Sequence, residues 1–109
     1  MKTTQQVARD FFKVIFEVLV NNSSRKYGLV VVSNIKEKFI KKYPFLKYLI
    51  VTKSSIKIEK GINSVETHEI GKAIEAIINM LGPNLLRLLL KERLDKGDKS
   101  FLHNVGVDF

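Results

Sequence analysis

Two apolar runs joined by a short polar connection decide the fold class of this chain: KYLIVT at residues 47–52 and SIKIEK at residues 55–60. The first run is almost continuously apolar, as in a strand that is covered on both faces. The second alternates apolar and polar side chains, as in a strand with one face in solvent. Because only Lys53 and Ser54 separate the two runs, the sequence predicts an antiparallel β-hairpin.

Helical periodicity dominates both sides of the predicted hairpin. Apolar residues recur every three or four positions over residues 4–21 and again over residues 70–81. Gly82-Pro83 ends the second of these helices, and a proline suits the first position of a further helix, which Gly97 would end. The tail over residues 98–109 keeps five large apolar side chains, so we expect it to dock on the rest of the chain.

The segment Tyr27–Val32 allows two interpretations. Its β-branched run fits a short buried strand, and it equally fits the first turns of a helix. Asn34 followed by Glu37 has the spacing of a helix N-terminus, so we expect a helix over residues 35–43 that Pro44 ends. If the preceding segment is a strand, the sheet gains a third strand through a βαβ crossover.

Together these elements predict an α+β protein with about four helices and a hairpin, in the order α-(β)-α-β-β-α-α. The 109 residues suit a single domain, residues 1–109. The order helix, helix, hairpin over residues 4–60 resembles that of winged-helix DNA-binding domains. A winged helix has two helices between its first helix and its wing. Residues 29–43 provide room for about one, so the resemblance assigns no recognition residue.

The net charge of +8 is concentrated in one third of the chain. Residues 25–60 contain ten Lys and Arg against two Asp and Glu, whereas the remaining residues contain nine of each. Residues 1–24 and 61–109 therefore form a neutral, largely helical scaffold around a basic segment. Such a concentration is typical of a surface that meets phosphate, an anionic membrane or an acidic protein, and a solvated face that keeps a small protein soluble is the alternative.

Lysine outnumbers arginine by 15 to 4, which favours phosphate contact over base recognition. We therefore expect a small regulatory or binding module that contacts the backbone of DNA or RNA. The residues expected to make this nucleic-acid contact are Arg25, Lys26, Lys38, Lys41, Lys42, Lys53, Lys57 and Lys60.

A second hypothesis is a protein-interaction or oligomerisation module with no nucleic-acid role. The first helix is apolar over more than half of its circumference, and leucines cover far more than one face of residues 85–94. Such surface exceeds what one small core absorbs, which favours a homo-oligomer or a protein partner. The expected interface residues are Phe12, Phe16, Leu86, Leu89 and Leu90.

The sequence lacks the combinations of residues that most catalytic sites require. The absence of cysteine excludes disulfides, thiolate zinc sites and thiol catalysis. His68 and His103 lack the spacing of a metal-binding helix, and Gly71-Lys72 lacks the rest of a phosphate-binding loop. We therefore expect no enzyme, no catalytic residue, no metal and no cofactor.

The apolar stretch at residues 11–20 is interrupted by charges, so we expect neither a signal peptide nor a membrane partner. The sequence therefore predicts a cytoplasmic protein.

Overall fold

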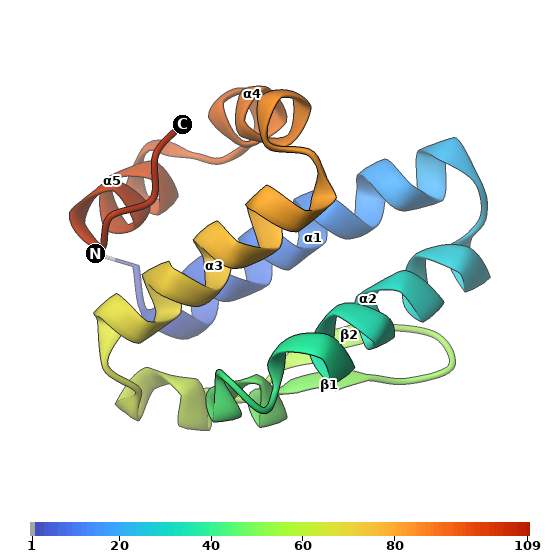
Figure 1. Ribbon diagram of the computed structural model, residues 1–109, viewed down its shortest axis with the longest axis horizontal. Helices are drawn as coiled ribbons and strands as arrows, with labels where there is room; N and C mark the ends of the chain where they lie inside the picture. Colours follow the sequence, from blue (N-terminus) through green and yellow to red (C-terminus); the bar gives the residue numbers. More distant parts are fainter. Residues whose placement is uncertain (1) are drawn as a thin grey trace.

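The structure is a computed structural model that describes residues 2–109 (Figure 1). The prediction of an α+β protein is confirmed, with five α-helices rather than about four in this part of the chain. Two short 3-10 helices, η1 and η2, flank the hairpin. In chain order the elements are α1 (Thr4–Asn22), α2 (Arg25–Phe39), η1 (Pro44–Tyr48), β1 (Leu49–Val51), β2 (Ile56–Ile58), η2 (Lys60–Ser64), α3 (Thr67–Leu81), α4 (Pro83–Arg93) and α5 (Lys96–Asn104).

The ambiguous segment Tyr27–Val32 is helical, which was one of its two interpretations, and the helix expected over residues 35–43 instead spans Arg25–Phe39. Helix α2 begins ten residues earlier, because the side chain of Ser24 caps it by accepting a hydrogen bond from the backbone N–H of Tyr27. The β-branched residues fit the helix because one face of it is buried in the core. The residues buried on that face are Gly28, Leu29, Val32 and Ile35.

The predicted hairpin is present, although each strand has only three residues. Leu49 pairs with Ile58 and Val51 with Ile56 in an antiparallel register, and residues 2–109 contain no third strand. A single α-helix and η1 lie between α1 and the hairpin, so the paired helices of a winged helix are not found there. The alternative of a βαβ crossover was also wrong, because its first strand is part of α2.

The C-terminal third differs from expectation at one boundary. Gly97 does not end a helix: α4 ends at Arg93, and Gly97 lies in the first turn of α5. Asp95 sets this boundary, because its carboxylate accepts a hydrogen bond from the backbone N–H of Asp98 and so caps α5. The expected docking of the tail is confirmed, since Leu102 is fully buried and Val107 is 2% exposed.

Three of the expected interface residues belong to the hydrophobic core. Phe12, Leu86 and Leu90 are 4%, 6% and 0% exposed, so they offer no surface to a partner. Much of the apolar surface of the first helix and of α4 is covered within the chain, because α4 packs on both α1 and α3. Phe16 and Leu89 are half-buried.

The elements form three levels in Figure 1. Helices α1 and α3 cross the middle of the molecule, α4 and α5 lie above them, and α2, the hairpin and the 3-10 helices lie below. Residues 25–60 therefore occupy one side, which we call the cationic layer. No helix within residues 2–109 has the length and apolar character needed to cross a bilayer.

Candidate nucleic-acid interface

The cations of the cationic layer have no acidic partners within the part of the chain that the structure describes. Among residues 2–109, none of the ten Lys and Arg of this layer lies within 4.0 Å of a carboxylate. All eight predicted contact residues are exposed. On the rest of the chain, by contrast, five cations are paired with acids: Lys2, Arg9, Lys72, Arg87 and Arg93. The excess charge is therefore available to an external partner.

A groove of about 830 Å³ separates the N-terminal half of α2 from the tip of the hairpin. It brings together three of the predicted contact residues, and no acidic side chain lines it. We call it the α2–hairpin groove. Its lining consists of the cations Arg25, Lys26 and Lys53, the apolar Leu29, Val30 and Val51, and the hydroxyl-bearing Ser33 and Thr52.

Arg25 also has a structural role that the sequence did not indicate. Its guanidinium donates hydrogen bonds to the backbone carbonyl of Ser54, with Nε at 3.0 Å. The same guanidinium lies over the ring of Phe16, 5.3 Å from the centroid. Arg25 therefore ties the tip of the hairpin to α1 and α2 and helps to shape the groove.

A second depression, of about 270 Å³, lies between α1 and the hairpin and adjoins Arg25. Arg9 and Lys13 of α1 line it, so two cations from outside residues 25–60 join the cationic surface. These two cations were not among the predicted contact residues because the charges of residues 1–24 nearly cancel. The available signal was their i, i+4 spacing, which places both side chains on one face of α1.

The other predicted contact residues lie outside the groove. Lys38 belongs to the last turn of α2, Lys57 to β2 and Lys60 to η2. Lys41 and Lys42 follow α2, and the ammonium of Lys42 lies 5.7 Å from the ring centroid of Tyr43. These residues share the cationic layer, but they do not line a common pocket.

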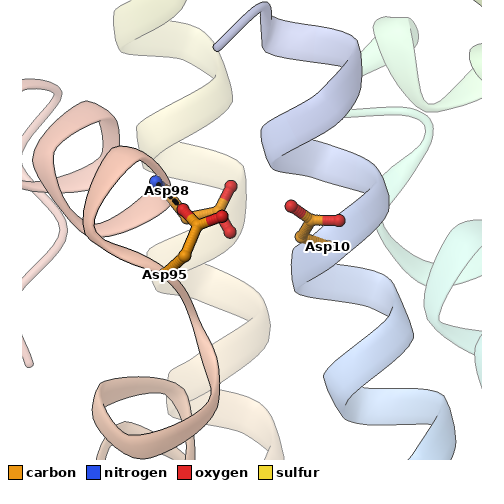
Figure 2. Close-up of side chains that lie close together, drawn as sticks. All are labelled: Asp10, Asp95 and Asp98. Carbon is orange, nitrogen blue, oxygen red and sulfur yellow. Dashed lines mark hydrogen bonds between the residues drawn. The ribbon is translucent and has the colours of Figure 1, made fainter. Parts of the chain in front are cut away.

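A cluster of three carboxylates lies away from the cationic layer. Figure 2 shows Asp10 of α1 facing Asp95 and Asp98 at the start of α5. One oxygen from each lies within 4.8 Å of the others, a donor set that could hold a cation. The ammonium of Lys2 takes that place, with Nζ 2.6 Å from Asp10 Oδ2, 2.5 Å from Asp95 Oδ2 and 3.2 Å from Asp98 Oδ1.

Burial and the neighbouring Asp10 raise the pKa of Asp98 from 3.8 to about 6. The hydrogen bond from Lys2 lowers the pKa of Asp95, and hydrogen bonds to Asp10 and Asp95 raise the pKa of Lys2. The cluster thus joins the start of the chain to α1 and α5. The cluster was not predicted because Asp10 is distant in sequence from the other two carboxylates.

No family model, curated protein or solved structure matches this chain significantly. The geometry and the charge of the site are therefore the basis for assigning a function.

Proposed function

We propose that this protein is a small, non-enzymatic, cytoplasmic binding module whose cationic layer contacts the backbone of DNA or RNA. The observation that carries the proposal is the set of ten cations in residues 25–60 that find no acid within the described chain. Like charges gathered on one side of a small protein repel one another, and a polyanion relieves this repulsion. Binding to nucleic acid also gains free energy from the release of condensed counterions.

The chemistry of the layer favours contact that is independent of base sequence. Nine of its ten cations are lysines, whose ammonium groups act as point charges rather than as bidentate forks. Its single arginine, Arg25, already donates to the carbonyl of Ser54. The layer therefore provides phosphate contacts, which set affinity and position without reading base edges.

We expect fluorescence anisotropy to show binding of labelled duplex or single-stranded oligonucleotides that weakens steeply with salt. If about five phosphates are neutralised, the slope of log K against log salt is about −4. Replacing two cations, Lys41→Gln with Lys57→Gln, should make that slope shallower by one to two and lower the affinity about tenfold at low salt.

The matched control is Lys91→Gln with Lys96→Gln, which removes the same charge from α4 and α5. Both control lysines are exposed and outside the cationic layer. Their replacement should change the slope by less than half of that amount. Equal effects of the two pairs would mean that net charge alone drives binding, and no binding at low salt would refute the proposal.

Self-association is a second candidate, because α4 leaves two leucines in solvent. Leu85 and Leu88 are 64% and 52% exposed. Leu85 also lines a shallow groove of about 100 Å³, together with apolar residues of α1, α3 and α4 that include Leu19, Leu81 and Leu89. Exposed apolar groups that cluster in this way are typical of a protein contact.

We expect light scattering of the wild type to show a dimer that Leu85→Glu with Leu88→Glu converts to a monomer. The substitutions place two charges in the apolar contact, which raises the dissociation constant at least a hundredfold. Because both positions are exposed, the variant should unfold at the same urea concentration as the wild-type monomer. A wild type that stays monomeric at high concentration would exclude this candidate.

A further inference from the structure

We propose that the α2–hairpin groove binds a single-stranded segment of nucleic acid, with phosphates at its cationic edge and a base on its apolar floor. This inference rests on the proposed nucleic-acid function and assigns that function a substrate class. It follows from three features of the groove: its floor, its charge and its openness.

The floor favours a single strand over a duplex. Leu29, Val30 and Val51 contribute the apolar lining, and Val30 is 49% exposed. A duplex presents phosphates and sugars on its outside and keeps the faces of its bases stacked inside. A single strand presents phosphates and unstacked base faces together, so it can cover this apolar surface as well as the cations.

The charge of the groove favours a polyanion. Arg25, Lys26 and Lys53 line it, and no carboxylate does. The groove is also shallow and open, so it would leave much of a small ligand in water. An extended polymer instead continues beyond the groove, past Arg25, toward the adjoining depression that Lys13 also lines. A chain with one negative charge per unit matches that arrangement better than a peptide, whose carboxylates are irregularly spaced.

Tyr27 provides an aromatic surface beside the groove. It lies three residues before Val30 in α2, so the two side chains project from neighbouring positions on one side of the helix. Tyr27 is 50% exposed, so its ring is accessible to solvent. It can stack on a second base next to the one on the floor.

The test compares oligo-dT and oligo-U of about 12 nucleotides with a duplex of the same total charge, by anisotropy over a salt series. We expect the single strands to bind at least tenfold more tightly than the duplex. Val30→Ser, which removes apolar floor without changing charge, should weaken single-strand binding about fivefold and leave both the salt slope and duplex binding unchanged. Val30→Trp should tighten single-strand binding, because it adds a stacking surface at a half-exposed position.

The matched control is Met80→Ser, which removes an exposed apolar side chain from α3 and should leave both affinities unchanged. Duplex binding as tight as single-strand binding, or a Val30→Ser variant indistinguishable from the wild type, overturns this inference while salt-dependent binding still supports the proposed function. If neither nucleic acid binds at low salt, both fail. Binding of a poly-glutamate probe with no oligonucleotide binding would assign the groove to an acidic protein and would also overturn the inference.

Discussion

Asp98→Asn is expected to stabilise the protein by about 2–3 kcal/mol at pH 7.5 and to leave its stability at pH 4 almost unchanged. Asp98 is 1% exposed, and its carboxylate faces Asp10, Asp95 and the ammonium of Lys2. The folded protein therefore holds a proton on Asp98 up to a pKa of about 6, whereas the unfolded chain releases it near the ordinary value of 3.8.

The sign of the effect follows from this difference in proton binding. Between pH 4 and pH 6 the folded state binds more protons than the unfolded state, so Asp98 makes the protein less stable as the pH rises. Asparagine resembles the protonated carboxyl, because its amide donates a hydrogen bond toward Asp10 and its oxygen still accepts from Lys2. It does not ionise, so the variant avoids the loss of stability that the wild type undergoes as Asp98 ionises.

Urea denaturation of both proteins at pH 4, 5, 6 and 7.5 measures the effect as a free energy of unfolding that diverges with pH. The matched control is Glu92→Gln, which removes the same charge from an exposed position of α4 and should change stability by less than about 0.5 kcal/mol at every pH. A difference between Asp98→Asn and the wild type that is independent of pH, or a destabilised variant at pH 7.5, would contradict this account of the cluster.

The spacing of apolar residues along the sequence correctly predicted the hairpin and α3. The alternation around Lys57 indicated the hairpin, and the periodicity up to Leu81 indicated α3. The start of α2 was missed because the β-branched residues Val30–Val32 suit either a strand or a helix. The cap at Ser24 and the packing of this segment on α1 together favour the helix. The end of α4 was missed because Gly97 was taken as the end of that helix. Asp95 instead caps a new helix, α5, which contains Gly97.

The candidate site could be predicted in composition but not in shape. The concentration of cations in residues 25–60 is visible in the sequence, whereas the groove exists only because α2 lies beside the hairpin. The expected interface failed at Phe12 and Leu90 for a related reason. Helix amphipathicity measures how much apolar surface needs a partner, and here the partner is another helix of the same chain.

Gly71→Ala is expected to destabilise the protein by about 2–3 kcal/mol and to release the C-terminal segment. Gly71 is buried in α3, where a Cβ atom would overlap the backbone carbonyl oxygen of Val105 and come within 2.9 Å of its Cγ2. A backbone carbonyl has no rotamer to change, so the end of α5 must move. That movement pulls on Leu102 and Val107, which are buried in the core.

The choice of alanine makes this a strict test, because alanine in a helix is otherwise favoured over glycine by about 1 kcal/mol. The matched control is Gly97→Ala in α5, where the nearest atom to the new Cβ is Lys2 Cγ at 3.3 Å, on a flexible side chain. The control should be neutral or slightly stabilising in urea denaturation.

Hydrogen exchange of Gly71→Ala should be faster over residues 101–109 than over α1, because the last turn of α5 loses its packing before the rest unfolds. If Gly71→Ala matches Gly97→Ala in stability, α3 and the C-terminal segment are not in the close contact described, and the docking of the tail on α3 would have to be rejected.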